Sequence, residues 1–339
     1  MSEYDKLLPQ GSDIAALLHL PADSNLQKQI EQTLLQPIGQ FLTRSGKRFR
    51  TQILEFGFDI ANDGRIPETA SRELCAKGAF VMESIHAASM VVDDIEDESM
   101  ERRGQPTLHR QVGIPVALNA GNWLYFWPLE RLKHWGLPPA QELKVYRLCM
   151  DAIVRAHLGQ AIDVGVPIDS LPQERVYETC LASMELKTGA LMGLAASLGG
   201  ALADADEPTL KLLQEFGSAF GVALQMFDDI GNLSGHNGDA PDLKQYEDLK
   251  LRRPSWVWAV AAQTSNAKEY DRLREAVKHL PDTSWVESWL NHQALPMRAK
   301  AMAVENLDAA FGPLEDRLGG AERLHWVREI GDRLRRAYD

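Results

Sequence analysis

Acidic and basic residues that could bind a metal ion and a phosphate stand together in the stretch ASMVVDDIEDESMERRG. Asp93 and Asp97 are spaced i and i+4, so on a helix both carboxylates project from one face. Carboxylates held this close repel each other unless a cation lies between them, and oxygen ligands suit Mg²⁺ or Mn²⁺. Arg102 and Arg103 follow, and guanidinium groups bind phosphate oxygens in a bidentate manner. The stretch therefore predicts a metal site beside a phosphate clamp.

An apolar stripe leads into these acids. Met82, Ile85, Ala88 and Ser89 precede them at helical spacing. A metal site, a phosphate clamp and an apolar wall in one segment fit a substrate with a diphosphate head and a hydrocarbon tail. An acidic run followed by arginines is also common at a solvated helix end, so the rest of the chain must decide between the two interpretations.

A second acidic helix end occurs later, in LQMFDDIGN, where polar side chains share one helix face. These are Gln225, Asp228, Asp229 and Asn232. Two such helices can pack side by side and present facing carboxylates across a cavity, where metal ions would bridge them to one diphosphate. The chemistry expected there is ionisation, because a metal-bound diphosphate is a good leaving group from an allylic carbon. An apolar cavity lined by helices would then keep water from the carbocation.

Composition and periodicity favour one all-α domain over residues 1–339. Hydrophobic residues make up 45% of the 339 positions, which is enough for a large core, and no linker or repeat divides the chain. We expect a polar N-terminal segment over 1–25 and a mobile active-site loop over 233–253. Helical spacing predicts helices over 26–42, 51–61, 69–92, 116–132, 141–164, 173–187 continuing to 203, 208–233, 254–264, 266–279, 284–291, 294–311 and 320–337.

Charge and cysteine content exclude several classes of protein. The net charge of −12 argues against a nucleic-acid partner, and local Lys, Arg and metal ions must attract an anionic substrate. Cys75, Cys149 and Cys180 are far apart and form no CxxC pair, which predicts neither a disulfide framework nor a zinc site and fits a cytoplasmic setting. No run is long and apolar enough for a confident transmembrane segment, and the start of the sequence lacks the plan of a signal peptide.

Five motifs together resemble the trans-isoprenyl diphosphate synthases, the polyprenyl synthetase family. SGKRFR, ASMVVDDIEDESMERRG, GQAID, LKTG and LQMFDDIGN occur in family order with family-like spacing. The sequence is most similar to the eukaryotic-type geranylgeranyl diphosphate synthases, which also have DDIED before a doubled arginine and an asparagine closing the second motif. The resemblance implies a large helical bundle with a central hydrophobic cavity and a homodimer.

The resemblance also implies a reaction. A magnesium-dependent prenyltransferase would condense isopentenyl diphosphate with dimethylallyl, geranyl or farnesyl diphosphate by ionisation, condensation and elimination. In this family the released diphosphate removes the final proton, so no dedicated side-chain base is expected. The substrates would be small isoprenyl diphosphates.

Site residues follow from the matching motif positions. Three Mg²⁺ ions, with Mn²⁺ as an alternative, would be held by Asp93, Asp94, Asp97, Asp163, Asp228, Asp229 and Asn232. The allylic diphosphate would be bound by Arg102, Lys187, Lys244 and Arg253. Isopentenyl diphosphate would be bound by Gly46, Lys47, Arg50, His86 and Arg103. Thr188 and Gln225 would turn oxygens toward the carbocation, so the residues expected to be catalytic are Asp93, Asp94, Asp97, Lys187, Thr188, Gln225 and Asp228.

Three positions depart from the family pattern. Asn232 replaces the last aspartate of the usual second motif, and its neutral amide oxygen should hold Mg²⁺ more weakly. Arg253 stands where lysine is usual, which keeps the charge but changes its geometry. Ser45-Gly46 stands where two glycines are common.

Product length should depend on the residues beneath the first acidic helix end. At the rise of an α-helix, Ser89 lies about 6 Å and Ile85 about 12 Å below Asp93. Ala88 and Ser89 are small where a bulky aromatic residue would stop a growing tail early, which predicts a C20 product, with Met82 and Ile85 lining the chain-length pocket. The alternative is that the small residues only allow close helix packing.

Two other functions share some of these features. A class I terpene cyclase would use the same metal motifs but has no second substrate, and therefore no use for Lys47, Arg50, His86 and Arg103. A non-catalytic regulatory subunit of a prenyl synthase would be expected to lose its acidic motifs, whereas here the first is intact and the second differs at one residue.

Overall fold

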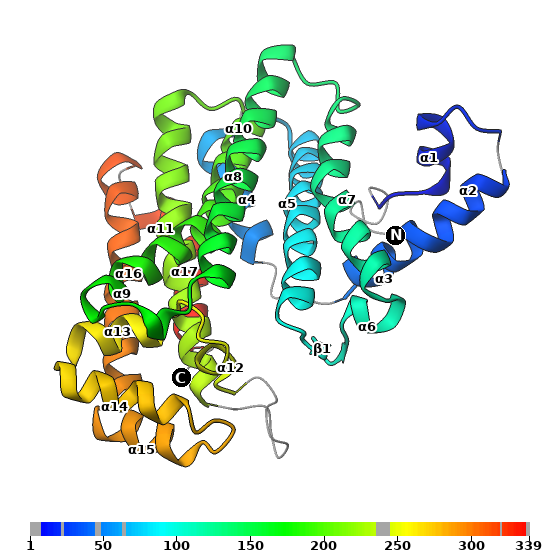
Figure 1. The fold of residues 1–339 in the computed structure, drawn as a ribbon. Helices are drawn as coiled ribbons and strands as arrows, with labels where there is room; N and C mark the ends of the chain where they lie inside the picture. Colours follow the sequence, from blue (N-terminus) through cyan, green and yellow to red (C-terminus); the bar gives the residue numbers. More distant parts are fainter. Residues whose placement is uncertain are drawn as a thin grey trace. The chain divides into compact units, whose positions relative to one another are not determined.

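Helices make up nearly all of the structure, a computed structural model that describes residues 8–21, 24–44, 49–62, 66–234, 245–318 and 321–336 (Figure 1). The all-α prediction is confirmed. Contacts along the chain gather into two compact units, one of Met1–Cys149 with Leu198–Asp206 and one of Met150–Ser197 with Glu207–Asp339. A single domain over 1–339 stays a prediction.

The first unit contains the N-terminal helices and the long helix that carries the first acidic helix end. Its elements are α1 (Gly11–Leu17), α2 (Asn25–Ile30), η2 (Glu31–Leu35), α3 (Gln36–Leu42), α4 (Phe49–Asn62), α5 (Glu68–Glu96), β1 (Glu101–Arg102), β2 (Gln105–Pro106), α6 (Leu108–Val112) and α7 (Ile114–Leu132), with the first part of α8 (Pro139–Gly165) and the last part of α10 (Ala190–Leu202). The helix predicted over 26–42 is found as α2, η2 and α3 in succession, with a π turn in the middle.

The core of this unit lies between α5 and α7, which run side by side (Figure 1). The contact surface is rich in alanine, so the two backbones approach closely. A Cβ atom on Gly121 of α7 would lie only 3.1 Å from a methyl group of Val91, so a larger residue there would push the helices apart. Buried residues of the cluster are Ile38, Phe41, Ala87, Ala88, Met90, Val91, Leu108, Ala117, Ala120 and Leu124.

The second unit is built around α11, which carries the second acidic helix end. Helix α11 packs against α16, and α13 packs against α9. Trp256 and Trp258 of α13 are completely buried, which anchors this helix in the core. Besides the second part of α8 and the first part of α10, its elements are η3 (Ile168–Ser170), α9 (Gln173–Met184), η4 (Glu185–Gly189), α11 (Glu207–Ser234), α12 (Glu247–Lys250), α13 (Trp256–Thr264), α14 (Ala267–Val277), α15 (Ser284–His292), α16 (Leu295–Leu318) and α17 (Ala321–Arg336).

The predicted loop over 233–253 begins later and contains more structure than expected. Helix α11 continues to Ser234, and α12 forms within the segment that follows residue 244. Residues 235–244 lie outside the described part of the chain. Across the described residues, every helix is too short or too polar to cross a lipid bilayer.

Candidate active site

The first acidic helix end lies on the last turn of α5. This helix continues past the predicted end at residue 92, because no proline or glycine interrupts it before Asp97, whose N–H donates to the Asp93 carbonyl at 2.9 Å. Asp93 and Asp97 are partly exposed, whereas Asp94 is 1% exposed. The two outer aspartates therefore keep the shared face that the i, i+4 spacing predicts, and the middle one turns inward.

A β-hairpin with a two-residue turn places Arg102 on a strand and Arg103 in the turn. Strands β1 and β2 pair antiparallel, and the turn between them consists of Arg103 and Gly104, with φ of 56° and 73°. Two left-handed residues in succession match the twist of a tight hairpin, and glycine reduces the strain at the second position. The buried Thr107 hydroxyl donates to the Ser99 carbonyl at 2.8 Å and ties the base of the hairpin to the end of α5. Arg102 and Arg103 consequently contact different partners.

Arg102 contacts the acidic helix end. Its Nε donates to Asp94 Oδ1 at 2.6 Å, and its Nη2 lies 3.4 Å from Asp93 Oδ2. A carboxylate as deeply buried as that of Asp94 requires a charged partner, and Arg102 supplies it. The pair holds a guanidinium group beside the two partly exposed aspartates.

Arg103 belongs to a basic cluster, which we define as Arg44, Arg50, Arg102, Arg103 and the imidazole of His86. Arg103 Nη1 donates to the Arg44 carbonyl at 3.3 Å, and Arg44 Nη2 donates to the Pro106 carbonyl at 3.2 Å. Burial lowers the pKa of both Arg44 and Arg103. Loss of hydration, followed by the positive charges of Arg50, Arg103 and Arg102, lowers the pKa of His86 well below its usual range, so its ring is neutral at pH 7.

Arg44 was not among the sequence predictions. Its Nε and Nη1 atoms are buried and find no acceptor among the described residues. The sequence offered one signal, that Arg44 stands directly before SGKRFR. An arginine next to a basic motif is by itself equally typical of an exposed surface residue. Of the predicted residues near it, Gly46 and Lys47 lie outside the described part of the chain, as does Lys244.

The residues predicted to line the chain-length pocket differ in burial. Met82, Ile85 and Ala88 are fully buried, and Ala88 belongs to the packed cluster between α5 and α7. Ser89 is partly exposed, and its hydroxyl donates to the His86 carbonyl at 2.8 Å. Close helix packing thus accounts for the small side chain at Ala88, and a role in product length stays a prediction for all four.

In the second unit, Asp163 of α8 lies next to two cations. Lys187 Nζ donates to Asp163 Oδ2 at 2.8 Å, and Arg253 Nη1 donates to the Asp163 carbonyl at 3.1 Å. Gly159, the glycine of GQAID, allows α8 to approach the Lys187 backbone closely, because a Cβ atom at this position would lie 2.4 Å from the backbone nitrogen of Lys187. Lys187 itself stands in the π turn η4, a type of distortion that is frequent at functional sites.

Four residues of the second unit form one hydrogen-bond chain. Thr188 Oγ1 lies 2.7 Å from Gln225 Oε1, and Gln225 Nε2 lies 2.7 Å from Asp229 Oδ1. Asp229 Oδ2 accepts the backbone N–H of Trp256 at 2.6 Å, at the start of α13. Asp229 is 4% exposed. Burial, and after it the charge of Asp248, raises the pKa of Asp229 well above its usual range.

Asp228 and Asn232 occupy the more exposed face of the second acidic helix end. Asp228 is exposed, Asn232 is partly exposed, and the two are spaced i and i+4 on α11. In the described ranges, no three His, Cys, Asp or Glu side chains gather into a metal-binding group. The donors are all oxygens, which suits Mg²⁺, an ion that takes one or two protein carboxylates together with substrate phosphates. The ligand set predicted for the metal stays a prediction.

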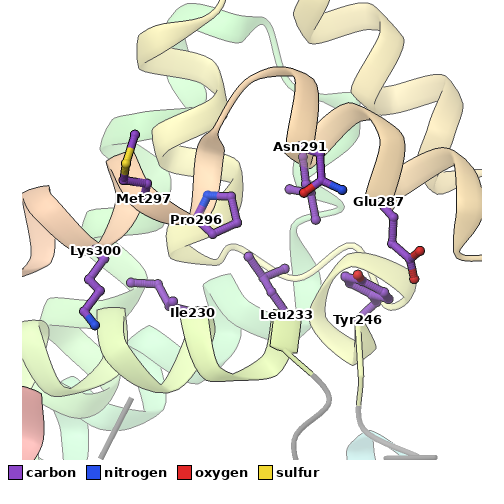
Figure 2. Close-up of a pocket in the computed structure, with 9 residues that line it drawn as sticks. Ile230, Leu233, Tyr246, Glu287, Asn291, Pro296, Met297 and Lys300 are labelled. Atoms are coloured by element: carbon purple, nitrogen blue, oxygen red, sulfur yellow. The ribbon is translucent and has the colours of Figure 1, made fainter. Parts of the chain in front are cut away.

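A pocket of about 430 Å³ lies on the other side of the same helix end (Figure 2). Ile230 and Leu233 form its floor, and Ile230 points about 200° away from Asp228 around the helix. Figure 2 shows Tyr246 and Glu287 at one end of the pocket and Lys300 at the other. Because the α11 residues that line it lie on the opposite face of that helix, this pocket is separate from the acidic face.

Comparison with known proteins places these motifs in a family. The family model described as polyprenyl synthetase matches residues 31–291. The geranylgeranyl diphosphate synthase of Sulfolobus acidocaldarius is 31% identical over 194 residues, which cover 57% of this chain and 56% of the relative. The geranylgeranyl pyrophosphate synthase of Geoglobus acetivorans is 30% identical over 223 residues, which cover 66% of this chain and 67% of the relative. The match thus spans little more than half of the first relative.

Solved structures show the same fold. The crystal structure of geranylgeranyl pyrophosphate synthase from Corynebacterium glutamicum, complexed with isoprenyl diphosphate and magnesium, superposes with a TM-score of 0.79. The two are 21% identical, and the superposition covers 98% of this chain and 97% of the other. At this identity the likeness concerns the fold alone.

Proposed function

Because the chain belongs to the polyprenyl synthetase family, we propose that it is a magnesium-dependent trans-prenyltransferase that joins isopentenyl diphosphate to an allylic diphosphate. One observation carries the proposal: in each unit, a carboxylate expected to bind metal holds a cation that could bind phosphate. Arg102 is held beside Asp93, and Lys187 beside Asp163. Carboxylates for a divalent cation next to cations for phosphate are what a diphosphate leaving group requires.

Carboxylate and amide oxygens at both acidic helix ends, together with Asp163 of α8, would hold the metal. Asp93, Asp97, Asp163, Asp228 and Asn232 are the ligands we propose for it, with three Mg²⁺ as the expected number. Bound Mg²⁺ would neutralise charge on the departing diphosphate. Asp94 instead holds Arg102 in place, and Arg102 would bind the allylic diphosphate. In the second unit Lys187 and Arg253, which both contact Asp163, would also bind that diphosphate.

The reaction breaks the bond between the allylic carbon and its oxygen, and the electron pair leaves with the diphosphate. The double bond of isopentenyl diphosphate then supplies the electrons for the new carbon–carbon bond, and the released diphosphate takes the proton that is lost. Arg50, His86 and Arg103 of the basic cluster would bind isopentenyl diphosphate, with Gly46 and Lys47 from the neighbouring segment. Neutral His86 can donate one hydrogen bond to a phosphate oxygen without adding charge.

The test is a product analysis by mass spectrometry. The purified protein is incubated with Mg²⁺, isopentenyl diphosphate and, separately, dimethylallyl, geranyl or farnesyl diphosphate. Elongated diphosphates that form only when both substrates and Mg²⁺ are present support the proposal. Cyclic hydrocarbons from the allylic substrate alone would identify a terpene cyclase, and inactivity that is relieved only by another synthase would identify a regulatory subunit.

We propose a C20 product, supported by the names of both relatives and by the small, partly exposed side chain of Ser89. Ser89→Phe should shift the main product to C15, whereas Ser89→Ala, which keeps the space, should leave it at C20. An unchanged product distribution in Ser89→Phe would remove Ser89 from the chain-length pocket. Ala88→Phe is a poorer test, since its core position would be overpacked.

A homodimer in the cytoplasm is the assembly and location we propose. Ile114, Leu118 and Phe126 are exposed on α7 within an arc of about 120°, and an apolar surface of this kind suits self-association. Light scattering after gel filtration should give twice the chain mass of 37.8 kDa, and Leu118→Glu should lower it. The three free cysteines support a reducing compartment.

A further inference from the structure

We propose that Asp229 is a positioning residue, which fixes the direction of the hydrogen-bond chain that runs through Gln225 to the hydroxyl of Thr188. The inference rests on the proposed prenyl transfer, in which Thr188 and Gln225 face the carbocation. It assigns to Asp229 a role different from the metal binding expected from the family pattern.

The direction of the chain follows from the donors at its far end. The N–H of Trp256 is part of the backbone and can only donate, so Asp229 Oδ2 must accept. Asp229 Oδ1 also accepts, because the group it meets at 2.7 Å is the side-chain amide of Gln225, which turns its NH₂ toward a carboxylate. Both oxygens of Asp229 are therefore committed to protein donors inside the unit.

The orientation of the Gln225 amide then decides that of the Thr188 hydroxyl. With its NH₂ toward Asp229, Gln225 presents its oxygen to Thr188, and the Thr188 hydroxyl must donate across 2.7 Å. A threonine within a helix commonly donates to the carbonyl one turn earlier, but here the proton is committed to Gln225. The hydroxyl oxygen consequently offers only lone pairs to any group beside it. An oxygen of this polarity stabilises a neighbouring positive charge, and a reversed hydroxyl would oppose it.

Asp229→Asn reverses the chain without changing its shape. The oxygen of the introduced side-chain amide must accept from the fixed Trp256 N–H, which leaves the NH₂ of that amide facing Gln225. Gln225 must then turn over to present its oxygen, so its NH₂ faces Thr188 and the Thr188 proton points away from it. We expect kcat to fall on the order of tenfold to a hundredfold, while KM for both substrates and the Mg²⁺ dependence change by less than about threefold.

A second substitution should restore the original direction. In the double variant Asp229→Asn with Gln225→Glu, the new carboxylate accepts from both the NH₂ of the introduced amide and the Thr188 hydroxyl. The pair again consists of one carboxyl group and one amide, as in the natural protein, and most of kcat should return. Gln225→Glu alone places a second carboxyl group against the buried Asp229 and should be the least active of the three.

Removing the hydroxyl tests whether Asp229 acts through Thr188. In a Thr188→Val background, Asp229→Asn should lower kcat by less than about threefold, because the group it reorients is gone. An equal loss of kcat in both backgrounds would overturn the inference, and so would a double variant no more active than Asp229→Asn. A large rise in the Mg²⁺ requirement of Asp229→Asn would instead restore the metal-binding role.

Two controls separate this inference from its premise. If the natural protein makes no elongated product, the proposed function fails; if it is active and Asp229→Asn retains full kcat, only the positioning role fails. Circular dichroism of each variant monitors folding. Should Asp229→Asn fail to fold, the double variant still decides, since the restored pattern predicts a folded and active enzyme, and an inactive folded one contradicts it.

Discussion

The two acidic helix ends share a pair of adjacent aspartates in the sequence, but the second aspartate of each pair contacts different partners. Each begins with a pair of adjacent aspartates, and in each pair the first is accessible and the second is buried, Asp94 to 1% and Asp229 to 4% exposure. The buried partner of Asp94 is a cation, Arg102, at 2.6 Å. The partners of Asp229 are two neutral N–H groups, those of Gln225 and Trp256.

This difference separates two ways of using a buried carboxylate. Asp94 and Arg102 offset each other, and the outcome is a partly exposed guanidinium group held where an anion can bind. Among the described residues no cation pairs with Asp229, so burial raises its pKa, and its effect passes along hydrogen-bond dipoles to Thr188. The first acidic helix end thus positions a charge, and the second positions a dipole.

The largest expected effects come from Asp93 and Asp228, the accessible first aspartates, which we expect to have equivalent roles at the two acidic helix ends. Asp93→Ala and Asp228→Ala should each lower kcat on the order of a thousandfold, because each removes a proposed ligand that balances the diphosphate charge. Steady-state kinetics over a range of Mg²⁺ concentrations measures the loss. Glu96→Gln, an exposed change on the same turn as Asp93, is the control and should stay within about twofold of the natural kcat. A loss of kcat below tenfold in either alanine variant would show that the two aspartates do not have equivalent roles.

The next effect concerns stability and belongs to the first acidic helix end alone. Arg102→Ala should lower the free energy of unfolding by about 3 kcal/mol, since it leaves the Asp94 carboxylate buried without its cation. Adding Asp94→Asn should recover part of the loss, because the buried charge is removed. Urea denaturation measures both.

Arg72→Ala is a matched control for that experiment. Arg72 forms an ion pair with Glu68 on the same helix, but their side chains are 67% and 80% exposed, so its loss should cost less than about 1 kcal/mol. If Arg102→Ala cost no more than Arg72→Ala, the claim that Asp94 depends on its cation would be wrong.

Sequence spacing was sufficient for the long helices and for the accessible residues of each acidic helix end, but not for the short helices α1, α6 and α12. It could not separate neighbouring aspartates, although a signal existed: Asp94 stands at i+3 and i+4 from the buried Val91 and Met90. The capping of Trp256 by Asp229 joins residues far apart in the chain, and no local pattern encodes it. The hairpin was missed because two-residue strands are too short to show alternation.

A smaller effect tests the last residue of the second acidic helix end. Asn232→Asp should lower the Mg²⁺ concentration for half-maximal activity by about threefold to tenfold, since a charged oxygen replaces a neutral one beside Asp228. The control is Asn122→Asp, which makes the same change of charge at an exposed position of α7. A shift of equal size in both variants would trace the gain to net charge, and no shift in either would show that the amide oxygen does not weaken the site.

The smallest effect concerns His86, whose cationic surroundings have no counterpart among the described residues of the second acidic helix end. Its pKa in the folded protein lies well below the unfolded value near 6.5, so unfolding takes up a proton once the pH falls below about 6.5. Its contribution to stability is therefore present above that pH and lost on acidification, by about 1 kcal/mol between pH 7 and pH 5.5. Urea denaturation at both values should show a smaller acid-induced loss in His86→Gln than in the natural protein. Equal losses would mean that neither burial nor the basic cluster lowers the pKa of His86.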